Sequence, residues 1–292
     1  FIPYDYKNYD CKDHLRTNVA FDFLDKKSSK EPFFLFMSYR APHSFEGPIR
    51  DTLDYKEEDW PDIEKAHAAK ITLLDRQIGR LINKLKELGE LDNTLILFTS
   101  DNGPHFDNGG HELEFFNSNG NLKGGKRDLY EGGIRVPLIA YWKNKIKSNS
   151  KTYHISGFQD IMSTFAEIIG YKTQKGLDGI SFLPTLISKD QPKHDYLNWE
   201  FQLSGWFQNL PSGGFRQSVR FDHWKAVRYS LNSDIELYDL NEDEGETNNQ
   251  AHLHPKIVKK AKDIFENSRS EQYGFPYGGV VQNYKSMERF VQ

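Results

Sequence analysis

The amino-acid sequence predicts an α/β protein. We expect a mostly parallel sheet flanked by helices, followed by a smaller α+β part built on an antiparallel sheet. Up to about residue 190, continuous apolar runs of strand length alternate with amphipathic helical patterns, which is typical of parallel sheets buried on both faces. Beyond it, short and often alternating runs are separated by turn residues, as in antiparallel sheets. We therefore predict a main α/β domain at 1–190 and a smaller subdomain at 191–292.

The first elements follow a strand, helix, strand order. The run "PFFLFMSY" at 32–39 predicts a buried strand. Residues 62–91 carry Ile and Leu at helical spacing, and Gly89 is a suitable place for that helix to stop. The run "NTLILFTS" at 93–100 predicts a second buried strand, so the polar residues after it lie at a strand end, where parallel sheets bind ligands.

The later elements alternate in the same way before the pattern changes. A strand is expected at 135–142 and an amphipathic helix at 157–170. The antiparallel strands are expected at 193–201, 215–221, 223–230 and 235–240, and the last helix at 254–270.

Composition excludes several classes of protein. The 292 residues carry a net charge of -4 and no dense basic stripe, so we expect no nucleic-acid partner. No apolar run reaches the length of a membrane span. The single cysteine, Cys11, rules out an internal disulfide. The abundant aromatic residues suit a protein that binds sugars, and they suit an ordinary core at least as well.

The chemistry-bearing residues gather after the two predicted strands. Asp101 and Asn102 offer oxygen atoms of the kind that Ca²⁺ and Mg²⁺ prefer, although on spacing alone a turn-forming pair explains them better. His43, in "RAPHSFEGP", is placed to donate a proton or is simply a loop residue. Lys123 and Lys126 flank two glycines, a pattern that fits either an anion site or a solvated basic loop.

These features occur in one order: "PFFLFMSYRAPHSFEGP", then "LDRQIGRLINKLKELGELDNTLILFTSDNGPH", then "NGNLKGGKRDLYEGGIRVPLIAYW". In that order and spacing they closely resemble the sulfatase family, the arylsulfatase-like and formylglycine-dependent enzymes of the alkaline-phosphatase-like superfamily. The segment "IELYDLNEDEGETNN" is similar to one that recurs near the C-terminus of that family. The resemblance covers nearly the whole chain and implies an alkaline-phosphatase-like fold, with an incomplete sheet in this chain.

The resemblance also implies roles for the matching residues. Asp101 and Asn102 would be metal ligands for Ca²⁺, with Mg²⁺ the less favoured ion. Lys126 would contact the sulfate, and His43 would protonate the departing alcohol; these two are the expected catalytic residues. Lys123 stands where the family often has another basic residue, so we give it a supporting role in substrate binding.

One part of the family pattern is missing from the 292 residues. Sulfatases form formylglycine from Cys or Ser within a Cys/Ser-x-Pro-x-Arg motif, and no such motif occurs here; Cys11 is followed by "KDH". The paired-aspartate segment that completes the metal shell is missing as well. We therefore expect the chain to be the C-terminal portion of a longer sulfatase and inactive alone. A separate chain that carries the missing N-terminal segment is one way to complete it.

The expected function is that of a sulfuric ester hydrolase, which removes sulfate from a sulfated carbohydrate by a covalent formylglycine-sulfate mechanism. Between the predicted metal ligands and Lys126, a loop offers His105, His111 and Asn119 for sugar hydroxyls and Phe115 or Phe116 for stacking; ordinary loop packing explains them equally well. Such an enzyme would be periplasmic or secreted in a bacterium. The alternatives are a phosphate or phosphonate ester hydrolase of the same superfamily, or a non-catalytic carbohydrate-binding remnant.

Overall fold

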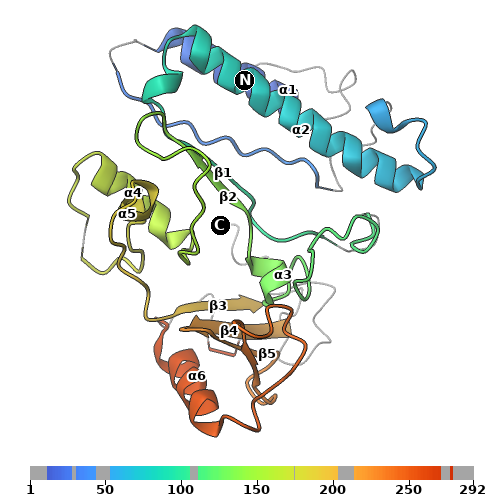
Figure 1. Cartoon of the computed structure of the whole chain (residues 1–292), viewed down its shortest axis with the longest axis vertical. Coiled ribbons are helices and arrows are strands. Elements are labelled where there is room, and N and C mark those ends of the chain that lie inside the picture. Colours follow the sequence, from blue (N-terminus) through green and yellow to red (C-terminus); the bar gives the residue numbers. More distant parts are fainter. Residues whose placement is uncertain are drawn as a thin grey trace, which may run out of the picture. The chain divides into compact units, whose positions relative to one another are not determined.

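The structure is a computed structural model that describes residues 12–27, 31–43, 53–105, 111–173, 175–202, 214–270 and 277–278 (Figure 1). Cys11 lies outside the described residues. The chain forms two compact units that interleave along the sequence. The first comprises Phe1–Ile96, His105–Ser118 and Tyr141–Asn144, and the second comprises Leu97–Pro104, Asn119–Ala140 and Lys145–Gln292. The boundary at residue 190 remains a prediction. Among the described residues, no helix combines the length and apolarity needed to cross a membrane.

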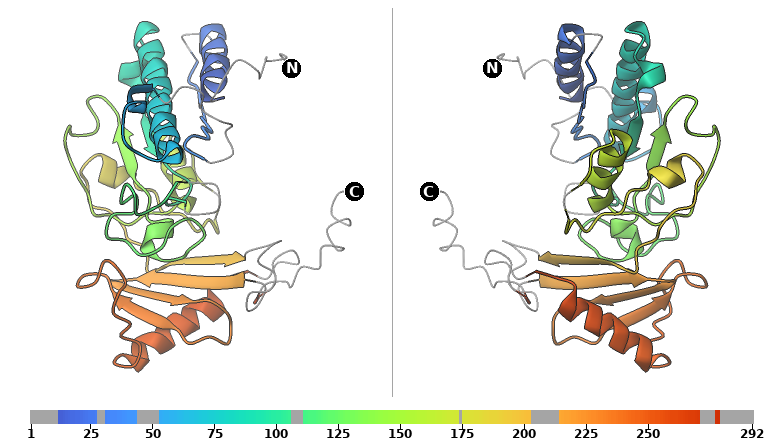
Figure 2. Two further views of the ribbon diagram at one scale, coloured as in Figure 1. Left: turned by 90° about the vertical axis from the view of Figure 1, so that its right-hand side faces the viewer. Right: turned by 90° about the vertical axis from the view of Figure 1, so that its left-hand side faces the viewer.

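Two long helices lie side by side in the first unit: α1 (Asp13–Lys26) and α2 (Asp62–Glu87) (Figures 1 and 2). Short 3₁₀ turns, η2 (Leu53–Tyr55) and η3 (Leu91–Asn93), flank α2. The predicted helix at 62–91 is confirmed, and the chain turns at Gly89, whose φ of 71° is the left-handed conformation that glycine adopts readily.

The predicted buried strand at 32–39 is wrong, because this segment forms no regular element in the structure. Its side chains alternate between half-buried and exposed, as in an extended chain, and the side chains of Phe34 and Phe36 are 69% and 79% exposed. A strand needs a hydrogen-bonded neighbour as well as an apolar sequence. No strand in the described part of the chain pairs with this segment.

The middle of the chain supplies a second group of elements. Strands β1 (Ile96–Thr99) and β2 (Leu138–Tyr141) pair in a two-stranded sheet, where the sequence predicted two strands. The predicted burial of the strand at 93–100 is wrong, because β1 has a single partner strand among the described residues and Phe98 is 38% exposed. The helices are α3 (Glu131–Ile134), α4 (Gln159–Ile168) and α5 (Leu183–Leu186). The predicted helix at 157–170 is confirmed as α4.

A four-stranded antiparallel sheet follows, as the sequence predicted, and its strand order is β3-β4-β5-β6. Its strands are β3 (Leu197–Gln202), β4 (Phe215–Phe221), β5 (Trp224–Arg228) and β6 (Glu236–Asp239). Helix α6 (Pro255–Asn267) lies along this sheet, as Figures 1 and 2 both show. The core between them is apolar because the inward side chains of the sheet meet the apolar stripe of the helix, namely Val219, Phe221, Trp224, Ala226, Leu237, Ala261 and Phe265.

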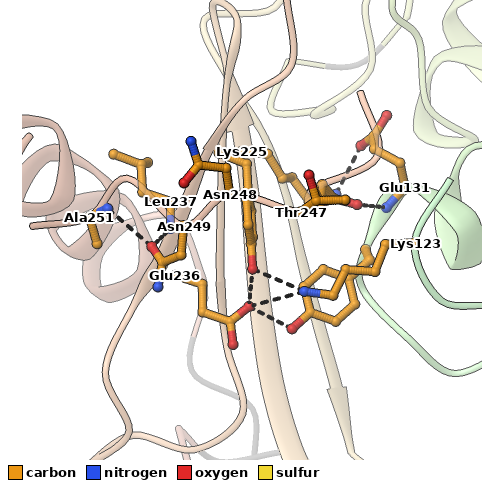
Figure 3. A network of polar contacts seen from close by, with 12 residues as sticks. Lys123, Glu131, Lys225, Glu236, Leu237, Thr247, Asn248, Asn249 and Ala251 are labelled. Atoms are coloured by element: carbon orange, nitrogen blue, oxygen red, sulfur yellow. Dashed lines mark hydrogen bonds and ion pairs between the residues drawn. The ribbon is translucent and has the colours of Figure 1, made fainter. Parts of the chain in front are cut away.

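A buried ion network connects α3 to this sheet (Figure 3). The Glu131 carboxylate accepts hydrogen bonds from Lys225 Nζ at 2.9 Å and from an Arg220 guanidinium nitrogen at 2.7 Å. The backbone N–H of Glu131 donates to the Glu246 carboxylate at 2.7 Å. Arg135, at the end of α3, forms an ion pair with Glu244. Glu131 of the "YEGGIR" motif is therefore fixed to the C-terminal sheet, whereas Arg135 pairs at the surface with a residue beyond the last strand.

The network shifts the ionisation of its two acids in opposite directions. Burial alone would raise the pKa of Glu131, but the charges of Lys225 and Arg220 outweigh burial and hold this pKa below its usual value. Glu246 is also fully buried, and burial raises its pKa to about 7 although Lys225 opposes the rise. In this network, Glu131 therefore stays ionised, whereas the neighbouring Glu246 takes up a proton near neutral pH.

Candidate active site

The predicted site residues fall into two groups, one in each compact unit. Those of the first unit are His43, His105 and His111, and those of the second are Asp101, Asn102, Asn119, Lys123 and Lys126. Each group forms a local arrangement of its own.

Asp101 and Asn102 lie directly beyond β1, where the chain turns. Asp101 is exposed. The Asn102 side chain donates from Nδ2 to the carbonyl oxygen of Gly103 at 2.9 Å, and Ser100 Oγ donates to the carbonyl oxygen of Asn102 at 2.9 Å. The turn that the sequence allowed is therefore present. The amide hydrogen bond uses the nitrogen of Asn102 and not its side-chain oxygen.

The oxygen ligands that Asp101 and Asn102 offer are of the type that a hard cation prefers, but they are too few to complete its shell. A carboxylate and an amide oxygen are what Ca²⁺ prefers, and it takes six or more oxygens. In the described part of the chain, no group of three or more His, Cys, Asp or Glu is arranged to hold a metal. Asp101 and Asn102 would thus supply a fraction of a calcium shell.

Backbone contacts bring the lysine loop to the same place. Lys126 donates its backbone N–H to the carbonyl oxygen of Pro104 at 2.7 Å, two residues after Asn102. Gly103 donates to the carbonyl oxygen of Gly133 at 2.9 Å. A Cβ on Gly103 would collide with the backbone of Gly132, so the two loops approach as closely as only glycine permits. The backbone therefore places Lys126 beside the predicted metal ligands.

Lys123 has different neighbours, which belong to the C-terminal sheet (Figure 3). Its ammonium donates to the Tyr238 hydroxyl at 3.0 Å and lies 3.9 Å from a Glu236 carboxylate oxygen. It also lies 4.0 Å from the centroid of the Tyr130 ring, a cation–π contact. These contacts hold Lys123 within the protein, and its expected supporting role in substrate binding stays a prediction.

Asn119 is likewise used within its own loop. Its Nδ2 donates to the carbonyl oxygens of Leu122 at 2.6 Å and Gly124 at 3.1 Å, which closes the turn before "GGK". Gly124 has a φ of 74° there, a conformation that favours glycine. The donor group of Asn119 thus shapes the loop that carries Lys126.

The histidines of the first unit form a chain of neighbouring rings. The ring centroids of His43 and His105 are 6.2 Å apart, and those of His105 and His111 are 6.3 Å apart. His111 is buried and stacks on His67 of α2 with centroids 3.6 Å apart. The structure therefore brings the three predicted histidines together and adds a fourth, His67, which the sequence analysis read only as part of an amphipathic helix.

Burial governs the charge of His67. The pKa of His67 is lowered to about 3, first by burial and then by His111, Lys70 and His105 around it. His67 is therefore neutral at physiological pH. Nδ1 of His111 lies 3.6 Å from the buried Glu64 carboxylate, which also accepts the backbone N–H of Glu112 at 2.6 Å. A polar patch that contains the neutral His67 thus adjoins His105 and His111.

An aromatic group borders the histidines. Phe115 and Phe116 are partly exposed, with ring centroids 4.8 Å apart, and both contact Trp60 edge to face. Trp60 in turn stacks on Tyr55 at 5.6 Å. The sequence does not indicate that Trp60 and Tyr55 join this group, because they lie about 55 residues or more upstream of the phenylalanines. The two segments meet only in the folded unit.

A family model described as sulfatase matches residues 2–171. The chain belongs to the sulfatase family. A second model, described as the C-terminal part of N-sulphoglucosamine sulphohydrolase, matches residues 124–271 of this sulfatase chain. The two matches together span the residues that carry the motifs and the antiparallel sheet.

The similar proteins agree with this membership. The sulfatase chain is 30% identical over 286 residues to an N-acetylgalactosamine-6-O-sulfatase of Bacteroides thetaiotaomicron, with 91% of this chain and 52% of that protein covered. It is 29% identical over 279 residues to the sulfatase YdeN of Escherichia coli, covering 85% of this chain and 48% of that protein. The chain thus spans about half the length of these curated relatives.

Solved structures show the same fold. The structure of Ps i-CgsB with k-i-k-neocarrahexaose matches with a TM-score of 0.78 at 23% identity, covering 96% of this chain and 59% of that one. A Bacteroides thetaiotaomicron structure, from work on the metabolism of multiple glycosaminoglycans, matches with a TM-score of 0.71 at 27% identity, covering 88% and 54%. The predicted alkaline-phosphatase-like α/β fold with a C-terminal antiparallel sheet is confirmed.

Proposed function

We propose that this chain forms the C-terminal portion of a sulfuric ester hydrolase that removes sulfate from a sulfated carbohydrate. The observation that carries the proposal is the hydrogen bond from Lys126 N–H to the Pro104 carbonyl oxygen, which joins the lysine loop to the turn after β1. It supports a site in which one cation and two oxygen ligands face the same sulfate. The sulfate group of an ester carries a negative charge spread over its oxygens, and positive side chains and a hard cation stabilise such a group.

Each residue has a separate task in the proposal. Asp101 and Asn102 would hold a calcium ion, which would supply Lewis-acid chemistry at the sulfate. Lys126 balances the charge that develops on the sulfate as the ester bond breaks. His43 gives a proton to the departing sugar oxygen, because an alkoxide is a poor leaving group at neutral pH.

The nucleophile is proposed to come from a segment outside these 292 residues. The family's Cys/Ser-x-Pro-x-Arg motif, from which formylglycine is made, does not occur among them. The share of the relatives that the chain covers, 52% and 48%, is in keeping with this proposal.

A carbohydrate sulfate is the preferred substrate for two reasons. The N-acetylgalactosamine-6-O-sulfatase relative acts on such a group by its name. In this chain, His111 stacks on His67, whose ring centroid lies 6.3 Å from that of the partly exposed Phe116, and His105 adjoins His111. Such a mixture of hydrogen-bonding and stacking groups suits a sugar. An enzyme for polysaccharides works where they are found, so the proposal includes a periplasmic or secreted location.

Substitutions in the enzyme that carries this chain test the assignment. We expect Lys126→Ala and His43→Ala each to lower kcat for a sulfated sugar by about 10²-fold or more. Lys143→Ala is the matched control, because Lys143 is exposed and pairs with Asp92 at the surface of the first unit. Full activity in Lys126→Ala would refute the proposal. Turnover of a phosphate ester in preference to the sulfate ester would favour a phosphate ester hydrolase instead.

A further inference from the structure

We propose that Asp13 is a positioning residue for His43. Asp13 begins α1 and is fully buried, 30 residues before His43 in the chain. Its carboxylate accepts the backbone N–H of Arg40 at 3.1 Å through Oδ1 and the backbone N–H of Ala41 at 2.9 Å through Oδ2. The inference rests on the proposed function, since it concerns the residue that would protonate the leaving group.

The turn that Asp13 holds ends at His43 itself. The backbone N–H of His43 donates to the carbonyl oxygen of Arg40 at 2.8 Å and closes the turn. From the other side, Lys70 Nζ of α2 donates to the carbonyl oxygen of His43 at 3.2 Å. The backbone that carries the imidazole is therefore fixed from α1 and from α2.

The anchoring carboxylate is itself held in place. Arg16, one turn further along α1, donates to Asp13 Oδ1 at 2.5 Å. Thr17 Oγ1 donates to the carbonyl oxygen of Asp13 at 3.0 Å and lies 3.0 Å from the Tyr39 hydroxyl, on the segment that leads into the turn. A buried carboxylate that binds two consecutive amides with two different oxygens fixes both the position and the direction of that peptide unit.

Asparagine cannot replace this arrangement. It has one acceptor oxygen, and its NH₂ group would face the second backbone N–H donor. Asp13→Asn therefore loses one amide contact and leaves a buried donor unsatisfied, with almost no change in side-chain volume. Because proton transfer depends on placement within about an ångström, a loosened turn lowers the catalytic contribution of His43.

A matched control exists in the second unit. Asp160 is also fully buried, and it accepts the backbone N–H of Gly157 at 2.8 Å and that of Ile180 at 2.8 Å. Asp160→Asn removes the same kind of carboxylate–amide contact in a segment that does not carry His43. A general loss of stability affects both variants, whereas a positioning effect belongs to Asp13→Asn alone.

The first experiment follows the turn directly in the 292-residue chain. By NMR, we expect Asp13→Asn to speed amide hydrogen exchange at Arg40 and Ala41 at least about tenfold and to shift the imidazole resonances of His43. Asp160→Asn should leave these signals in place. If Asp13→Asn does not fold, Lys70→Met loosens the same turn from α2 and should shift the same resonances. Unchanged His43 signals in the folded variant overturn the inference.

The second experiment uses the leaving group to separate positioning from simple damage to the fold. In the enzyme that carries this chain, Asp13→Asn should lower kcat about tenfold for a sugar sulfate, with little change in KM. It should lower kcat much less for 4-nitrophenyl sulfate, whose leaving group needs no proton. Equal losses on both substrates, or an equal effect of Asp160→Asn, would show that Asp13 acts on stability alone. No sulfate release by the wild-type enzyme would refute the proposed function instead.

Discussion

At the scale of single residues, Glu246 has an unusual environment for a carboxylate. It is fully buried, it accepts the backbone N–H of Glu131, and its pKa is raised to about 7 by burial. The folded protein therefore keeps a proton on Glu246 between about pH 4.5 and 7, while the unfolded chain has released it. Because the folded state then binds more protons, the free energy of unfolding falls as pH rises through this window.

The expected pH profile follows from this sign. One pKa unit corresponds to about 1.4 kcal/mol, so Glu246 lowers the free energy of unfolding by at most about 3 kcal/mol between pH 4.5 and 7. Glu131 acts oppositely: its pKa is held low, so its contribution is lost as pH falls below the usual range of a glutamate. We expect Glu246→Gln to flatten the decline between pH 4.5 and 7 in urea unfolding, and Glu242→Gln, at an exposed position, to leave it unchanged. A decline of equal slope in Glu246→Gln would contradict this account.

Some contacts of single residues can be predicted from the sequence, and others cannot. The residue types and the order of the motifs were enough to single out Asp101, Asn102 and Lys126, which the backbone brings together. They did not reveal the partners of Lys123, because Tyr238 and Glu236 lie more than 100 positions away in the chain. A lysine next to two glycines has the same local sequence whether it faces an anion or a tyrosine.

At the scale of elements, glycines set how closely the loops of the second unit approach. A Cβ on Gly132 of α3 would collide with the carbonyl oxygens of Lys123 and Gly124. The same residue donates its backbone N–H to the carbonyl oxygen of Lys123 at 2.8 Å. The short helix α3 therefore supports the loop that leads to Lys126, and only a residue without a side chain fits at this contact.

Two glycine substitutions should have opposite effects. Gly132→Ala should lower the free energy of unfolding by about 1–3 kcal/mol, because the colliding atoms are backbone and cannot move aside cheaply. Gly79→Ala should raise it by about 0.5–1 kcal/mol, because Gly79 is exposed within α2 and a Cβ there has no atom within 4 Å. Thermal and denaturant unfolding measure both. A neutral Gly132→Ala would mean that the loop moves freely away from α3.

Elements differ in how far the sequence determines them. Helix α2 and the strands β3 to β6 were predicted because their periodicity and turn residues are local properties. Helix α1 was not predicted, because its apolar side chains do not form a single stripe. Leu15 and Leu24 are buried, whereas Val19 and Phe23 are exposed. The segment 32–39 has the composition of a strand, but strand formation depends on a partner elsewhere in the chain.

At the scale of the whole molecule, the chain shares the sulfatase fold with longer proteins, of which it covers about half. The chain covers 52% and 48% of the two curated relatives and 59% of the Ps i-CgsB chain, and these values agree with one another. The residues proposed to hold calcium and sulfate belong to the matched part. The proposed source of the nucleophile does not, because the Cys/Ser-x-Pro-x-Arg motif is not among the 292 residues.

The 292-residue chain alone should therefore bind its ligands without turning them over. We expect no sulfate release from 4-nitrophenyl sulfate or from a sulfated sugar at any calcium concentration, because charge balance by Lys126 and protonation by His43 assist an attack that has no nucleophile. Calcium binding by the folded chain should be weak in calorimetry, because Asp101 and Asn102 supply only part of the shell, and weaker still in Asp101→Asn, because one of the two oxygen ligands loses its charge. Lys126→Ala is the control for contaminating enzyme. Sulfate release by the wild-type chain that disappears in Lys126→Ala would show that these residues contain a nucleophile of their own and would overturn the proposed division of the active site.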